Sequence, residues 1–210
     1  MPWVAAADVL KWYLWGKSKV PLAKVSSGLL TSAAAPLALT FTSTIVGDLL
    51  ILICGGTLPT ITGGHGSGWS YSDQTGGGTS IRIAWKFAAA ADVGATFTIS
   101  TVANGAPFAW VSYRGPTTMV LKESVALDST TTLPFSGFAP ASSNVGALII
   151  GFSHGGGTTT SMVPPNGWVK DVENPNFGAK ASLSMDGYAG GAVTVTGLTG
   201  AICGTLWELA

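Results

Sequence analysis

The stretch VGALIIG, residues Val145–Gly151, decides how this chain folds, because it repeats an earlier stretch, VGDLLIL, at Val46–Leu52. Ninety-nine residues separate the two copies, and the same interval separates Gly68-Trp69 from Gly167-Trp168. Later segments correspond in the same order: a Thr-rich segment (97–100 and 193–196) and a closing aromatic segment (106–113 and 201–207). Self-similarity of this kind indicates an architecture built twice from one unit.

Short apolar and alternating segments, bounded by turn residues, predict strands along most of the chain. We expect about ten of them, near residues 37–42, 49–54, 81–87, 95–101, 108–114, 119–122, 130–135, 147–153, 179–185, 192–196 and 202–208. The Gly-rich stretches 55–78 and 155–178 are predicted to be long loops. The pattern predicts an all-β, jelly-roll-like β-sandwich over residues 27–210, in which two units at about 37–115 and 130–210 share one core.

Residues 1–26 differ from the rest of the chain. Apolar side chains predict a short N-terminal helix over residues 3–15, ended by Gly16, and residues 22–36 are predicted to be a linker. The segment is basic: residues 1–24 contain four lysines and one aspartate, a net charge of +3. Its large apolar side chains, the candidate docking residues, are Trp3, Leu10, Trp12, Tyr13 and Trp15.

Three interpretations of this aromatic segment remain open. It anchors the protein to a partner subunit, because aromatic residues are enriched in interface cores. Alternatively, it folds back and covers one end of its own sandwich. A helix lying on a membrane surface is a third interpretation, which the small number of polar residues disfavours.

The composition bounds the possible partners. Only 10% of the residues are charged, 47% are hydrophobic, and the formal net charge is zero. A weakly charged surface favours self-association, so we expect a homo-oligomer. The chain does not have the excess of basic residues that would indicate nucleic-acid binding. No apolar run reaches the roughly 20 residues of a membrane-spanning helix, and the N-terminal segment does not fit a secretory signal.

The sequence predicts neither a cofactor nor a metal site. Cys54 and Cys203 lie in apolar strands and are interpreted as buried free thiols, although a disulfide is open if their strands are neighbours. The two histidines, His65 and His154, have no metal-ligand spacing. No glycine cluster opens a helix as a phosphate loop does, and no pair of carboxylates has a spacing typical of a glycosidase.

The segment Gly151-Phe152-Ser153-His154-Gly155 fits the G-x-S-x-G pattern of hydrolases. A nucleophile elbow needs a helix directly after the serine, yet Gly-Gly-Thr-Thr-Thr follows it, and no histidine lies downstream to serve as the base. We therefore predict that the protein is not an enzyme, and a hydrolase acting through Ser153 is the least favoured hypothesis.

Trp69 and Trp168 follow glycine at equivalent places of the two units. An aromatic ring in a loop can stack on a sugar, which makes these two residues candidates for glycan binding. Repetition of the Gly-Trp pair in both units favours the alternative that each indole fixes its loop to the sandwich. Trp85, Trp110 and Trp207 fall within strands and are predicted to pack in the core.

The motifs of the first unit, in their order, resemble a family of virion proteins. These motifs are GDLLI at 47–51, GW at 68–69, IAWKFA at 83–88, TFTIS at 96–100 and VSYRG at 111–115, followed by a degenerate second copy at 145–206. In this order they resemble accessory virion proteins of tailed bacteriophages and related gene-transfer particles. The resemblance covers residues 37–210 and leaves out the segment 3–15.

The resemblance implies a structural, non-enzymatic part of a phage-like virion, either a capsid decoration or head fibre or a tail component. The protein would contact other virion proteins and would be attached through its N-terminal segment. It would be located in the virion, which is assembled in the host cytoplasm. The alternative is a carbohydrate-binding module that recognises a host surface glycan through Trp69 or Trp168.

Overall fold

The structure is a computed structural model of the chain and describes residues 21–30, 36–55, 60–62, 67–76, 79–100, 108–128, 130–141, 145–154, 161–175 and 180–210. These residues form an all-β protein with fifteen strands, paired antiparallel throughout. Within the described ranges the one helical element is the 3₁₀ turn η1 (Ala90–Asp92). The prediction of an all-β chain is confirmed.

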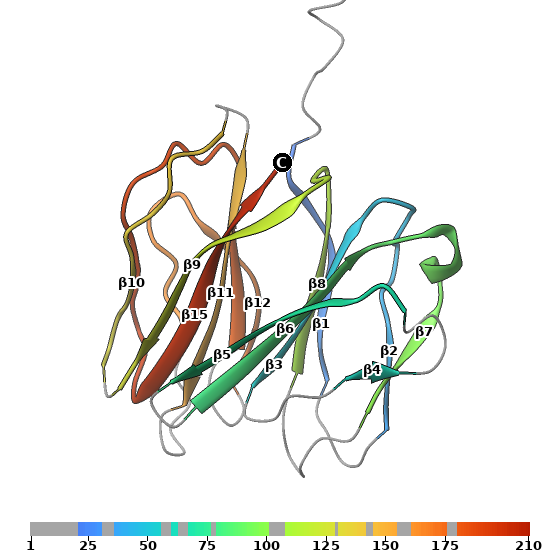
Figure 1. Cartoon of the computed structure of the whole chain (residues 1–210), viewed down its shortest axis with the longest axis horizontal. Helices are drawn as coiled ribbons and strands as arrows, with labels where there is room; N and C mark the ends of the chain where they lie inside the picture. Colours follow the sequence, from blue (N-terminus) through green and yellow to red (C-terminus); the bar gives the residue numbers. More distant parts are fainter. Residues whose placement is uncertain are drawn as a thin grey trace, which may run out of the picture.

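Two five-stranded sheets form the centre of the molecule (Figure 1). The order of the first sheet is β5 (Ser70–Gly76), β6 (Thr79–Phe87), β3 (Leu49–Gly55), β8 (Phe108–Arg114) and β1 (Ala23–Leu30). The order of the second is β12 (Val169–Asn174), β13 (Lys180–Met185), β11 (Gly146–His154), β15 (Ala201–Leu209) and β9 (Met119–Leu127). Both sheets have the segment repeated in the sequence, β3 or β11, as their central strand.

A smaller sheet covers the outer face of each large one. Strands β2 (Leu37–Thr40), β7 (Thr96–Ile99) and β4 (Ile61–Thr62) cover the first sheet. Strands β10 (Leu133–Phe135) and β14 (Val193–Val195) cover the second. An isolated bridge from Val163 to Thr196 lies just beyond β14, where β4 pairs with β7 in the other half. The molecule therefore has four layers, which follow one another across Figure 1.

Three hydrophobic cores separate these four layers. The central core lies between the two large sheets and takes residues from both, including Ile51 and Ile83 from the first and Ile150 and Trp207 from the second. The outer cores lie beneath the small sheets. Strand β3 is buried along its whole length, and so is β11 as far as Ser153. A sheet covered on both faces needs continuous apolar strands, which explains the composition of the repeated segment.

The two large sheets stack with their strand orders reversed relative to each other. Strand β1 packs on β12, and β5, at the opposite edge, packs on β9. Strands β9 and β12 take the places in the second sheet that β1 and β5 take in the first. The first half (residues 23–114) therefore meets the second (residues 119–209) about an approximate two-fold axis, as two subunits do in an isologous dimer.

Several details of the sequence-based organisation are wrong. Residues 23–30 form β1 in the first sheet rather than part of a linker, so the predicted boundary at residue 26 cuts a strand. The predicted loop 55–78 contains β4 and β5, and the loop 155–178 contains β12. Strands β1, β5 and β12 are edge strands with many polar side chains, which weakens the apolar signal on which the prediction rests. The predicted helix at 3–15 lies outside the described residues.

Candidate functional site

Ser153 lies in the interior at the end of β11, where its hydroxyl is fully buried. Its Oγ donates a 2.8 Å hydrogen bond to the carbonyl of Thr199. His154, the next residue, is exposed, and its side chain points to the other face of the sheet, as alternation along a strand requires. The serine hydroxyl is thus held by a neighbouring loop, and the two side chains do not form a nucleophile–base pair.

Both loop tryptophans are buried. Trp69 is 9% exposed and packs edge-on against Phe97, with ring centroids 5.5 Å apart. Trp168 is 7% exposed and packs against Tyr188 at 5.9 Å. The preceding glycines, Gly68 and Gly167, have φ values of +81° and +82°, which favour glycine and turn each indole inward. The packing supports the role of fixing the loops, because each side chain is more than nine-tenths buried.

The two tryptophans differ in their polar surroundings. The ammonium of Lys86 lies 5.9 Å from the Trp69 ring, donates to the Ser67 carbonyl and forms a buried ion pair of 2.9 Å with Asp92. The indole N–H of Trp69 has no hydrogen-bond partner among the described residues. In the second half, Leu183 takes the register position of Lys86, so this ion pair has no counterpart beside Trp168.

The five candidate docking residues of the aromatic segment, Trp3, Leu10, Trp12, Tyr13 and Trp15, lie outside the described residues. The described chain begins at Pro21, and the first contact with the body follows at once. The N–H of Leu22 donates to Oδ1 of Asp186 at 3.3 Å, and the Leu22 side chain packs on the central core. The segment therefore joins the body at the end of the second half where β13 ends.

No group of His, Cys, Asp and Glu within the described ranges has the geometry of a metal site. Cys54 and Cys203 are buried free thiols, as predicted. Burial raises the pKa of Cys203 to about 12 and raises that of Cys54 well above its usual value, so neither is a reactive thiolate. Burial also lowers the pKa of the Lys180 amine, which lies 4.6 Å from the Phe152 ring, to about 8.

A polar cluster crosses the central core between the two halves. The Tyr113 hydroxyl donates to Oδ2 of Asp171 at 2.6 Å and lies 2.7 Å from the hydroxyl of Ser182. On the outer side, the backbone carbonyl of Asp171 accepts hydrogen bonds from Lys24 and Ser27 of β1. Burial raises the pKa of Asp171, against the opposing effect of its hydrogen bonds, and raises that of Tyr113. These groups connect the two halves, and they have no access for a ligand.

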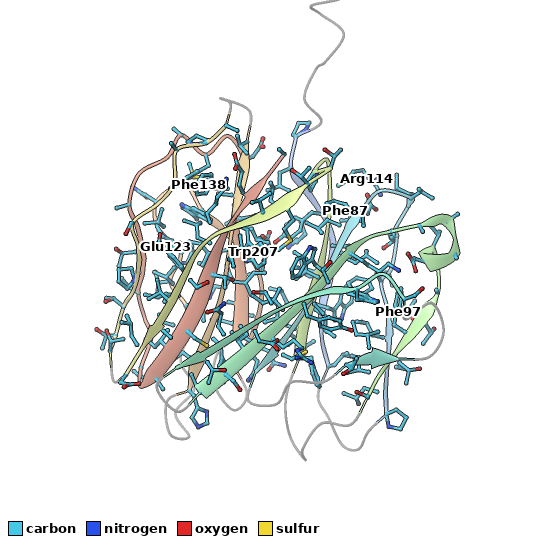
Figure 2. All side chains as sticks on the ribbon, viewed as in Figure 1. Phe87, Phe97, Arg114, Glu123, Phe138 and Trp207 are labelled. Atoms are coloured by element: carbon cyan, nitrogen blue, oxygen red, sulfur yellow. The ribbon has the colours of Figure 1, made fainter. Side chains whose placement is uncertain are left out.

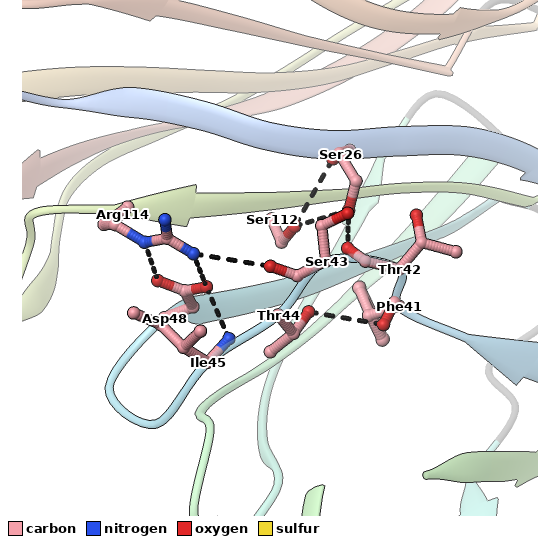
Figure 3. A network of polar contacts seen from close by, with 9 residues as sticks. All are labelled: Ser26, Phe41, Thr42, Ser43, Thr44, Ile45, Asp48, Ser112 and Arg114. Atoms are coloured by element: carbon pink, nitrogen blue, oxygen red, sulfur yellow. Dashed lines mark hydrogen bonds and ion pairs between the residues drawn. The ribbon is translucent and has the colours of Figure 1, made fainter. Parts of the chain in front are cut away.

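A network of polar contacts holds the loop between β2 and β3 at the surface (Figure 3). Arg114 donates to both carboxylate oxygens of Asp48 at 2.9 Å, and Oδ2 of Asp48 also accepts from the Ile45 N–H. Ser43 has a φ of +60°, the one non-glycine residue in the described part with a positive value. This network presents Ile45 and Val46 to solvent, where they are 50% and 60% exposed. Branched apolar side chains held at a fixed loop tip suit contact with another protein.

A depression of about 310 Å³ lies beside Trp168 on the second half. Its apolar wall includes Trp168, Met185 and Tyr188, and the edges include Asn166 and Thr194. The hydroxyl of Tyr188 donates to the Gly191 carbonyl, and its ring lies 4.7 Å from that of Phe138, labelled in Figure 2. Sequence analysis missed this feature because Tyr188 comes from an irregular loop with no pattern to mark it.

Comparisons with protein-family models, with curated proteins and with solved structures find no match to this chain. Among the described residues, no helix is long and apolar enough to cross a membrane. The candidate functional features therefore come from this chain's own sequence and structure. They are the exposed Ile45-Val46 loop tip, the depression beside Trp168 and the aromatic N-terminal segment.

Proposed function

We propose that the protein is a structural accessory component of a phage-like virion, in the capsid or the tail, attached through its N-terminal segment. In this proposal the chain consists of two jelly-roll units packed back to back. The order β1-β8-β3-β6 opposite β2-β7-β4 supports this, since a jelly roll winds the first and last strands of a unit together. Strand β5 departs from the pattern, because it extends the large sheet beside β6.

The observation that carries the proposal is the continuous core between the halves. Tyr113 and Trp207, from the two closing strands, are both buried in it, so neither half presents its large sheet to solvent. Such a body is rigid, and what it offers to partners is the exposed loop tip and the N-terminal segment. Rigid β bodies with short attachment segments suit decoration of a repetitive surface, where every copy makes the same contact.

The carbohydrate-binding alternative has less support. It depends on an open ring at Trp69 or Trp168, and both indoles are more than nine-tenths buried. We therefore assign the two residues to loop packing within the proposed virion protein.

Incorporation into particles tests the proposal. The tagged chain is expressed in the source strain while particles are produced, and particles purified by density gradient are analysed by quantitative mass spectrometry. We expect the chain at several copies per particle and a loss of at least tenfold for a chain without residues 1–20. A full-length variant with Ala at Val120, an exposed position on β9, is the matched control. Particles without the intact chain would contradict the proposal.

A further inference from the structure

The depression beside Trp168 and the point where the N-terminal segment joins the body both lie at the end of β13, on opposite faces of the second sheet. Leu22 is hydrogen-bonded to Asp186, while Met185 and Tyr188, within two residues of Asp186, both line the depression. The described chain therefore begins at the same end of the second half as this apolar depression.

The chemistry of the depression suits an aromatic side chain with a polar edge. Its volume of about 310 Å³ is at the lower end of the roughly 300–1,000 Å³ typical of ligand pockets. Trp168, Met185 and Val193 provide apolar contact, and the exposed side chains of Asn166 and Thr194 offer hydrogen-bond groups at the rim. An indole has this combination of a large apolar face and a single N–H donor.

The N-terminal segment offers such side chains within reach. Trp12, Tyr13 and Trp15 precede Leu22 by ten, nine and seven residues. Seven residues of extended chain span up to about 24 Å, enough to turn back from Leu22 to a surface that begins at Met185. Apolar side chains of this size favour any surface that removes them from water.

We propose that the depression lined by Trp168, Met185 and Tyr188 binds the chain's own N-terminal segment through the indole of Trp15 before the protein meets a partner. The segment then rests on its own body in the free protein, and a partner that binds the same aromatic side chains must displace it. The inference goes beyond virion attachment, since it concerns the isolated protein.

Chymotryptic cleavage of the purified full-length protein tests this inference, because the protease cuts after Tyr13 and Trp15 themselves. We expect slow cleavage in the unmodified chain. Ala192→Arg, at an exposed position that lines the depression, places a cation in it and should accelerate cleavage at both sites at least tenfold. Trp15→Ala should accelerate cleavage after Tyr13 to a similar degree.

Thr96→Arg is the matched control, since strand register places Thr96 in the first half where Ala192 lies in the second. It should leave the cleavage rate unchanged, and near-ultraviolet circular dichroism should show intact packing in every variant. Cleavage of Ala192→Arg at the rate of the unmodified protein would overturn the inference. So would protection that appears only as protein concentration rises, because the segment would then dock on a second copy. None of these outcomes depends on particles, so they leave the proposed virion role to its own test.

Discussion

Two corners of the central core occupy equivalent places but have opposite chemistry. In the first, Tyr113 of β8 meets Ser182 of β13 through a 2.7 Å contact of their hydroxyls. In the second, Trp207 of β15 meets Trp85 of β6 with ring centroids 5.0 Å apart. Tyr113 and Trp207 lie opposite Leu49 and Leu148, which correspond in the repeated segment, so the approximate two-fold axis relates the two contacts.

The repeat therefore preserves backbone positions rather than side-chain chemistry. Ser182 takes the place of Trp85, and the smaller side chain leaves room for the carboxylate of Asp171 beside the Tyr113 hydroxyl. The polar corner joins the two halves by hydrogen bonds, whereas the aromatic corner joins them by ring packing, and the Trp207 indole N–H donates within its own strand to the Thr205 hydroxyl at 2.7 Å. The edge strands β1 and β9 resemble each other more closely. Each has a bulge where it pairs with β8 or β15, beside Tyr113 or Trp207 respectively.

The largest effect is expected at the aromatic corner. Trp207→Ala removes a side chain that is 1% exposed and leaves a cavity beneath Trp85, which should lower the free energy of unfolding by about 3–5 kcal/mol. Urea denaturation measures the change. Val120→Ala, a neighbouring exposed position on β9, should change stability by no more than about 0.5 kcal/mol. Equal losses in the two variants would show that the aromatic corner does not hold the halves together.

At the polar corner, Tyr113→Phe keeps the ring and removes the hydroxyl. Asp171 and Ser182 then each lose a buried partner, and the expected loss is about 1–3 kcal/mol in the same denaturation measurement. Tyr71→Phe serves as the control, because its hydroxyl accepts a hydrogen bond at a more exposed site. A Tyr113→Phe protein as stable as the unmodified one would remove the distinction between the corners.

The Gly-Trp loops should respond alike in both halves. A Cβ at Gly68 or Gly167 meets no atom closer than 3.8 Å and 3.5 Å respectively, so the cost of Gly→Ala comes from the positive φ alone. We expect each substitution to lower the free energy of unfolding by about 1–2 kcal/mol, with the two values agreeing. Thermal denaturation of both variants tests this, and clearly unequal losses would indicate that the two loops do not have the same backbone.

The smallest effect concerns pH. Burial raises the folded-state pKa of Asp171 above its unfolded value, so folding favours the protonated carboxyl relative to the unfolded chain. The stability that it contributes is complete below an unfolded pKa of about 3.9 and is lost as pH rises through the folded pKa. Urea denaturation at pH 3.5, 5 and 7 measures the free energy of unfolding of both proteins. As the pH rises, the unmodified protein should lose stability relative to Asp171→Asn. A difference that is constant across this range would contradict the assignment.

The apolar strands were predictable from sequence because their signal is local. Leu49–Gly55 and Gly146–His154 are strands close to the predicted positions, since a strand buried on both faces requires an uninterrupted apolar run. Ala23–Leu30, Ser70–Gly76 and Val169–Asn174 escaped prediction, because edge strands tolerate polar residues. Of the candidate site residues, Trp69 and Trp168 were placed correctly in equivalent loops, and only the structure shows that both are buried.

The all-β class and the two apolar central strands, β3 and β11, follow from the sequence alone, since both depend on local pattern. Only the tertiary structure shows that the large sheets face each other about an approximate two-fold axis, that Asp171 meets Tyr113, and that both loop tryptophans are buried. Those features depend on residues distant in the chain, whose packing no local pattern specifies.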